Sequence, residues 1–115
     1  MAWKAVRMAG PAQVSNAAAT KYTVPATTIA RVRHIHVQNP SASPVTFTMS
    51  IGADAAGTRI YDAYSIPAAA AGQPASVFDA WCYYVLAAAE ILQALAGTNN
   101  ILTLTIDGDE SILGT

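Results

Sequence analysis

Charged residues are scarce in this 115-residue chain. Lysine and arginine together number 6, aspartate and glutamate 7, and the charged share is 11%, against about 25% in an average soluble domain. The formal net charge of −1 argues against a general nucleic-acid binder, because such proteins carry a basic excess. The hydrophobic share is 53%, although alanine contributes much of it. We expect a surface that is covered by other copies of the chain or by a larger body.

Cysteine and long hydrophobic runs are also lacking. Cys82 is the only cysteine, which excludes an intrachain disulfide and a zinc knuckle. It lies among aromatic residues in "DAWCYYVL" and is predicted to be a buried small hydrophobic residue. No uninterrupted apolar run reaches the roughly 18 to 20 residues of a membrane span, and the start does not resemble a secretory signal. The sequence therefore predicts synthesis in the cytoplasm and no membrane partner.

The few charges are unevenly distributed. A basic first third and an acidic remainder suit head-to-tail contact between subunits, whereas solvated charges without a partner are the alternative. The basic residues of the first third are Lys4, Arg7, Lys21, Arg31 and Arg33; after them come Arg59 and the acidic residues Asp54, Asp62, Asp79, Glu90, Asp107, Asp109 and Glu110.

Several segments alternate apolar and polar residues with a period of two. In "PVTFTMSIG" the residues Val45, Phe47, Met49 and Ile51 face one way, and residues 102–106 repeat the pattern. In residues 58–67 the same rule places Ile60, Tyr64 and Ile66 together, with Asp62 among them. Segments 2–9 and 19–25 are weaker strand candidates. Turn residues separate these runs at intervals of about 8 to 14 residues.

This rhythm predicts an all-β fold, an antiparallel β-sandwich that is jelly-roll-like with about eight strands. We expect residues 1–19 to form an N-terminal strand or arm and residues 20–115 to form the sandwich domain.

Two segments leave alternatives open. Residues 86–97, "LAAAEILQALAG", are rich in helix formers, yet "AAAE" also suits a turn between two strands. In residues 27–39, strict alternation would put Arg31 and Arg33 on the face of Ile35 and Val37. Either this strand bulges near Arg33 or the two arginines lie beyond the edge of the core.

The stretch "RVRHIHVQNP" raises the question of a metal site. On a strand, His34 and His36 lie side by side on one face, and two histidines with one carboxylate form a ligand set that is adequate for iron. A third ligand would have to be an acid or Cys82, and nothing in the spacing selects among Asp62, Asp79 and Asp107. We therefore expect no metal, and histidines that face solvent or a neighbouring subunit.

Catalytic and ion-binding motifs are otherwise missing. The segment "TIDGDE", residues 105–110, lacks the full pattern of a calcium loop, and no nucleophile elbow, P-loop or zinc-protease motif occurs. The expectation is a protein that is not an enzyme and has no cofactor. Trp81, Tyr83 and Tyr84 are in a cluster that could stack on a sugar, although aromatic residues at this density are more often core or subunit interface.

Two long phrases carry a resemblance. "TKYTVPATTIARVRHIHVQNPSASPVTFTMSIGADAAGTRIYD" followed by "LQALAGTNNILTLTIDGDE" resembles small β-sandwich virion structural proteins of tailed bacteriophages. The similarity spans roughly residues 20 to 110 and is one of pattern and phrase, with no catalytic motif. It favours two strands over a helix in residues 86–97.

The resemblance implies a virion structural protein, most simply a capsid decoration protein that binds and reinforces the shell. A tail-associated protein and a carbohydrate- or receptor-binding module are the alternatives. The implied partners are other copies of the chain, as a trimer or ring, and the major capsid protein or tail proteins, with no nucleic acid. The expected localisation is the virion. Residues expected at subunit or capsid contacts are Trp3, Lys4, Arg7, Arg31, Arg33, His34, His36, Asp107, Asp109 and Glu110.

Overall fold

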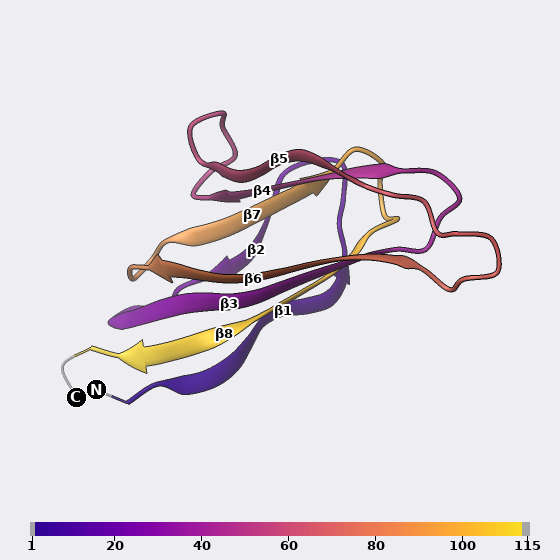
Figure 1. Ribbon diagram of the computed structural model, residues 1–115. Helices are drawn as coiled ribbons and strands as arrows, with labels where there is room; N and C mark the ends of the chain where they lie inside the picture. The colour runs from indigo at the N-terminus through magenta and orange to yellow at the C-terminus, as the bar shows by residue number, and fades with distance from the viewer. Residues whose placement is uncertain (1, 114–115) are drawn as a thin grey trace.

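The computed structural model describes residues 2–113, and these form eight β-strands and no helix (Figure 1). None of these residues belongs to a helix that is long and apolar enough to cross a membrane. The strands are β1 (Lys4–Gln13), β2 (Ala19–Thr23), β3 (Thr28–Asn39), β4 (Val45–Ile51), β5 (Arg59–Ile66), β6 (Ser76–Leu86), β7 (Ile91–Ala96) and β8 (Thr103–Ile112).

The strands form two antiparallel sheets of four. The order is β1-β8-β3-β6 in the first, called sheet I, and β2-β7-β4-β5 in the second, called sheet II. Strands from the first half of the chain pair with strands from the second half in reverse order: β1 with β8, β2 with β7, β3 with β6 and β4 with β5. The chain is thus one long antiparallel ribbon rolled into a sandwich, which is the jelly-roll topology. This confirms the predicted fold class.

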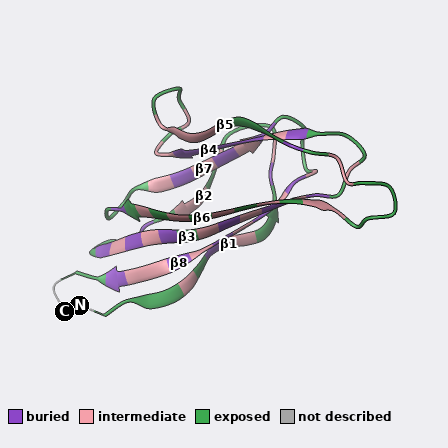
Figure 2. Ribbon diagram, viewed as in Figure 1, coloured by how far each residue is buried: buried purple, intermediate pink, exposed green. Residues whose placement is uncertain are grey.

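The core lies between the two sheets, and alternate residues of β3, β7 and β8 enter it, together with Val45, Phe47 and Met49 of β4 (Figure 2). Each fully buried large side chain stabilises the fold by about 1.5–3 kcal/mol relative to an exposed one. The largest buried side chains are Phe47, Ile35, Met49, Ile66, Leu86, Leu92, Leu102, Leu104, Ile106, Val14, Val24 and Val32. The inward faces predicted for residues 45–51 and 102–106 are confirmed.

The N-terminal segment is part of the sandwich. Strand β1 forms one edge of sheet I and pairs along its length with β8. Val14, just after it, is fully buried, and its backbone exchanges hydrogen bonds of 2.9 and 3.0 Å with Leu102 and Asn100. Of the two alternatives for residues 1–19, residues 4–13 form a strand.

Residues 86–97 form the end of β6, a turn and β7, so the helix alternative is wrong. Glu90 closes the turn, since its backbone N–H donates to the Ala87 carbonyl at 3.1 Å and its side chain accepts from the Ala87 N–H at 2.6 Å. Strand β7 lies between β2 and β4, with Leu92, Ala94 and Ala96 in the core. This pairing on both sides overrides the helix propensity of the sequence.

Strand β3 bulges where the sequence requires it. Its pairing with both β6 and β8 shifts between Val32 and His34, so that Val32 and Ile35 both enter the core. Gly108 of β8 lies opposite Val32, and a Cβ atom there would stand 2.2 Å from the Arg31 carbonyl oxygen. The glycine therefore lets β8 approach the bulge closely.

Strand β5 differs from the prediction. Ala63 has a φ of 49°, and the register with β4 shifts on the way past it. As a result Tyr61 packs against Phe47, with ring centroids 6.4 Å apart, while Tyr64 is 49% exposed. Tyr64 therefore does not join Ile66 in the core, because a backbone irregularity resets the alternation.

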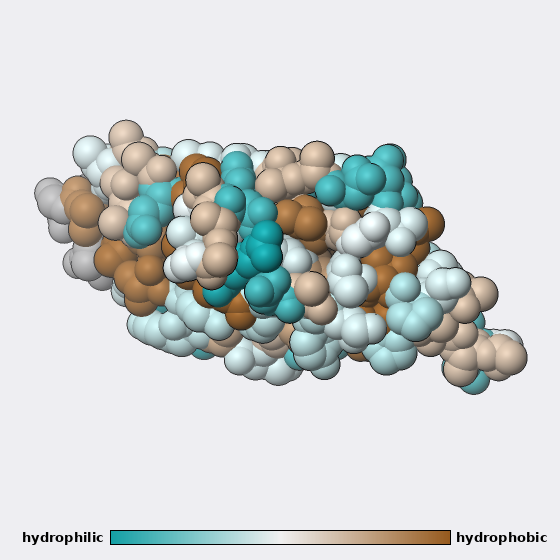
Figure 3. Space-filling model, turned by 90° about the horizontal axis from the view of Figure 1, so that it is seen from above, coloured by the Kyte–Doolittle hydropathy of each residue, from teal (hydrophilic) through white to brown (hydrophobic). Residues whose placement is uncertain are grey.

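The molecule is elongated, with principal extents of 51, 28 and 18 Å. Figure 3 looks down on it from the side of β4 and β5, where hydrophilic residues gather in bands between hydrophobic patches.

Candidate functional site

The outer face of sheet I carries most of the unusual side chains. The bulge in β3 turns Val32 and Ile35 inward, and it thereby leaves Arg31, His34 and His36 on the outside. Beside them β6 presents its odd-numbered residues, because this strand alternates strictly between intermediate and exposed positions. The face is therefore built from two neighbouring strands, with β8 on the far side of β3.

Strand β6 is apolar on both faces although it is an edge strand. Its inward residues Phe78, Ala80, Cys82 and Tyr84 pack against the core, and burial raises the pKa of the Cys82 thiol. Its outward apolar residues are strongly exposed: Trp81 78%, Tyr83 61%, Val77 54% and Val85 51%. A strand that is apolar on both faces usually has both faces covered. Sequence reasoning noted Trp81 and Tyr83 as an aromatic cluster, but it missed that Val77 and Val85 extend them into one odd-numbered apolar row along β6.

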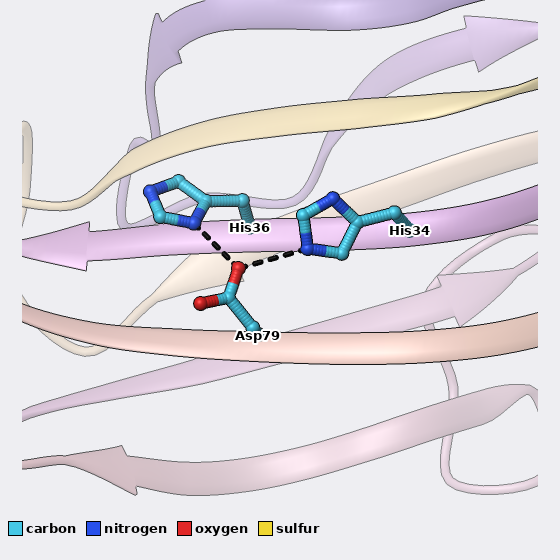
Figure 4. Close-up of side chains that lie close together, drawn as sticks. All are labelled: His34, His36 and Asp79. Carbon is cyan, nitrogen blue, oxygen red and sulfur yellow. Dashed lines mark hydrogen bonds and ion pairs between the residues drawn. The ribbon is translucent and has the colours of Figure 1, made fainter.

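His34, His36 and Asp79 converge on this face (Figure 4). The Asp79 Oδ1 atom lies 2.8 Å from His34 Nε2 and 2.6 Å from His36 Nδ1. Asp79 stands directly opposite His36 in the β3–β6 register. The hydrogen bond from His36, followed by that from His34, holds the pKa of Asp79 below its usual value of 3.8.

Trp81 fixes the ring of His34. The two rings stack with centroids 3.9 Å apart and planes 10° apart, and the two residues are opposite each other across the strands. Stacking on a large flat ring limits rotation of the imidazole. The His34 nitrogen that faces Asp79 is therefore held in place by Trp81, which lies on the same strand, β6, as Asp79.

The structure thereby identifies Asp79 as the acid that lies beside the two histidines, a choice that the sequence left open. Asp62 belongs to β5 in sheet II and pairs with Arg59 at 2.9 Å. Asp107 is opposite His34 on the β8 side but pairs with Arg7 at 3.5 Å. Cys82 points inward, with its sulfur 3.7 Å from the Val32 carbonyl oxygen. Asp79 alone among these four joins the histidines in a ligand cluster within the described part of the chain.

A second cluster joins arginine side chains to Asp109. Arg31 Nε and Arg33 Nη1 both donate to Asp109 Oδ2, at 2.8 and 3.1 Å. Chiefly through the bond from Arg31, the pKa of Asp109 lies below its usual value. The guanidinium of Arg31 also lies over the rings of Trp3 and Tyr83, 4.1 and 5.6 Å from their centroids. Cation–π contact of this kind orders aromatic side chains on an open surface.

The predicted contact residues all lie on or beside sheet I, but Glu110 of β8 turns its side chain towards sheet II. The Tyr22 hydroxyl of β2 donates to Glu110, so this acid links sheet I to sheet II. Lys4 is its register partner on β1. Each acidic side chain of "TIDGDE" has a partner within the chain: Asp107 pairs with Arg7, Asp109 with two arginines, and Glu110 with Tyr22. These contacts account for the cluster of acidic residues.

The charge split also has an internal explanation. Arg7, Arg31 and Arg33 of the basic third find their acidic partners, Asp107 and Asp109, within the same chain. Strand pairing of β8 with β1 and β3 brings the two ends of the sequence together. These charges are therefore paired without a second copy of the chain. Their uneven distribution along the sequence no longer supports head-to-tail attraction between subunits.

Comparisons with protein-family models, with curated proteins and with solved structures found no match for the chain.

Proposed function

We propose that this chain is a structural protein of a tailed-bacteriophage virion, most simply a capsid decoration protein that attaches through the outer face of sheet I. The assignment to a virion rests on the resemblance of residues 20 to 110 to virion structural proteins of tailed bacteriophages. The observation that carries the attachment surface is the exposed apolar row of β6, with Trp81 78% and Tyr83 61% exposed. The proposal involves no catalytic step.

The fold supports this reading in general terms. Jelly rolls recur among viral capsid domains, but also among lectins and metal-binding enzymes. Fold alone therefore does not select a function. The low charge and the two-sided apolar character of β6 favour a subunit whose outer face is covered in its assembly.

Attachment is expected to depend on apolar burial. Exposed ion pairs contribute only about 0–1 kcal/mol each, and Asp109 already holds two arginines within the chain. Burial of one large apolar side chain is worth about 1.5–3 kcal/mol. Val77, Trp81, Tyr83 and Val85 would therefore supply most of the affinity.

The test uses purified particles of the phage that encodes the chain. Mass spectrometry should find the protein in many copies per particle, and electron cryo-microscopy should place it on the shell with sheet I inward. The double variant Val77→Glu with Val85→Glu should fail to bind stripped particles, whereas Tyr64→Glu on sheet II should bind normally. Absence of the protein from particles would refute the proposal, and density along the tail would favour the tail alternative.

A sugar- or receptor-binding module is the second candidate, because Trp81 and Tyr83 project from one exposed strand face. Such a pair can stack on sugar rings. Binding of a defined glycan by the isolated monomer, lost in Tyr83→Ala and kept in Val77→Glu, would favour this candidate. The virion proposal predicts no glycan binding by the monomer.

A further inference from the structure

The triad of His34, His36 and Asp79 has the composition of a metal site. Two imidazoles and one carboxylate suit zinc, copper, nickel and iron, in contrast to the all-oxygen sets that magnesium and calcium prefer. All three ligand atoms lie within 4.8 Å of one another. The set carries one negative charge when the histidines are neutral, which favours a divalent cation.

The backbone preorganises these ligands. His34 and His36 come from β3, Asp79 comes from β6, and the two strands are hydrogen-bonded neighbours in register. The Trp81 ring holds His34 by stacking. Ligands on strands keep their geometry better than ligands on loops, so little ordering remains to be done when an ion binds.

The spacing is close to what an ion needs. A cation at about 2.0–2.2 Å from each nitrogen and oxygen would separate the ligand atoms by roughly 3.0–3.4 Å. Asp79 Oδ1 now lies 2.8 and 2.6 Å from the two nitrogens. Binding of the ion therefore requires Asp79 Oδ1 to withdraw by roughly half an ångström. It also requires the two imidazole nitrogens, now within 4.8 Å of each other, to stand at the separation given above. The Asp79 side chain is 39% exposed and has room to move outward.

From this convergence we infer that the outer face of sheet I binds one divalent transition-metal ion, such as Zn²⁺, through His34, His36 and Asp79. The ion replaces the two hydrogen bonds to Asp79 and clamps the edge strand β6 to β3. Its remaining coordination positions point away from the sheet, where water or a donor atom from another molecule can occupy them. The inference stands independently of the virion proposal and departs from the expectation of a metal-free chain.

The experiment is calorimetric titration of the full chain with ZnCl₂, with MgCl₂ as the hard-cation control. One equivalent of Zn²⁺ should bind and raise the Tm, while Mg²⁺ should do neither. His36→Ala and Asp79→Asn should each weaken Zn²⁺ binding at least about tenfold. Asp79→Asn keeps an oxygen that accepts hydrogen bonds from both rings, so it separates metal ligation from loss of the bridge. Asp62→Asn, an exposed acid on sheet II, should bind Zn²⁺ as the parent does.

Fluorescence gives a second readout in case a histidine variant fails to fold. The chain has two tryptophans, so Trp3→Phe leaves Trp81 alone, in contact with the His34 ring. One equivalent of Cu²⁺ should quench its emission, and Asp79→Asn should require at least about ten times more Cu²⁺ for the same quenching.

Two results would overturn the inference. One is the absence of a stoichiometric Zn²⁺ heat together with unquenched Trp81. The other is equal affinity in the parent, His36→Ala and Asp79→Asn, which would leave the triad as a hydrogen-bonded bridge only.

Discussion

Asn39 is the buried polar side chain with the most hydrogen bonds in the loop region. It is fully buried, and its amide nitrogen donates to the carbonyls of Ser43, Ile66 and Pro67 at 3.0 to 3.2 Å. Its oxygen accepts from the backbone N–H and the hydroxyl of Ser41. One side chain thus ties the β3–β4 loop to the end of β5, and this region is adjacent to the start of β6.

The change Asn39→Asp should destabilise the fold by roughly 2–4 kcal/mol, because a buried carboxylate would face three carbonyl oxygens and could donate to none. Urea denaturation measures this. Asn99→Asp is the matched control: the Asn99 oxygen is exposed and accepts from the Asn16 N–H at 3.2 Å, and a carboxylate can do the same. The control should stay within about 0.5 kcal/mol of the parent. Equal effects in both variants would refute this role for Asn39.

Single residues also show where sequence reasoning reaches its limit. Alternation was enough to place Phe47 and Leu104 in the core, because side chains on a regular strand follow a period of two. It failed at Tyr64, where the positive φ of Ala63 resets the period. Asp79 was one of three equal choices, since the partner of His36 depends on which strands are neighbours. Strand order is a property of the whole fold and is not encoded in local spacing.

The β6–β7 turn shows how an element overrides its local sequence. Three alanines and Glu90 favour a helix by propensity, yet they form a tight turn in which Ala89 has a φ of 70°. Side chains at such angles cost energy that glycine does not incur. The turn forms because β6 pairs with β3 in sheet I and β7 pairs with β2 and β4 in sheet II, so the chain must cross between the sheets here.

Ala89→Gly should stabilise the chain by about 0.5–1 kcal/mol, because relief of the left-handed backbone exceeds the added freedom of the unfolded chain. Its neighbour Ala88, whose φ is not positive, provides the opposite sign. Ala88→Gly should cost about 0.4–1 kcal/mol through unfolded-state entropy alone. Thermal and urea denaturation of the two variants would contradict this account if both shifted in the same direction.

The ion pairs between Asp109 of β8 and the arginines of β3 should make an acid-sensitive contribution to the stability of the fold. The pKa of Asp109 is depressed, chiefly by its bond from Arg31. A depressed folded-state pKa adds stability that is fully present above the unfolded value of 3.8 and is lost as pH falls through the folded value. The parent should therefore be more stable than Asp109→Asn at pH 6, and the difference should shrink as the pH drops below 3.8. A difference in Tm that is independent of pH would contradict the assignment.

At the scale of the whole molecule, the order of the sheets decides which face can serve assembly. The interior is filled by apolar side chains from both sheets, so binding groups must lie outside. Sheet I gathers the histidine–aspartate triad, the arginine–aspartate cluster and the exposed aromatic residues of β6 on one side. The rolled ribbon produces this grouping, because it places the N-terminal third beside β8.

Residues 1–16 include β1 and the buried Val14, so their removal would damage the core and is a poor test of assembly.

Substitutions on the outer face test assembly without touching the core. We expect a closed homo-oligomer, a trimer or ring, in which each copy meets its neighbour through part of the apolar row that also contacts the shell. Such a ring closes by head-to-tail contact between two different patches of each copy. Trp81→Ala combined with Tyr83→Ala should shift the chain to monomer, while circular dichroism should stay that of the parent because both side chains are more than half exposed. Tyr64→Ala on sheet II, also exposed, should leave the oligomer intact. Analytical ultracentrifugation over a wide concentration range decides, because a parent chain that stays monomeric at high concentration would exclude self-assembly and leave this face to a different partner.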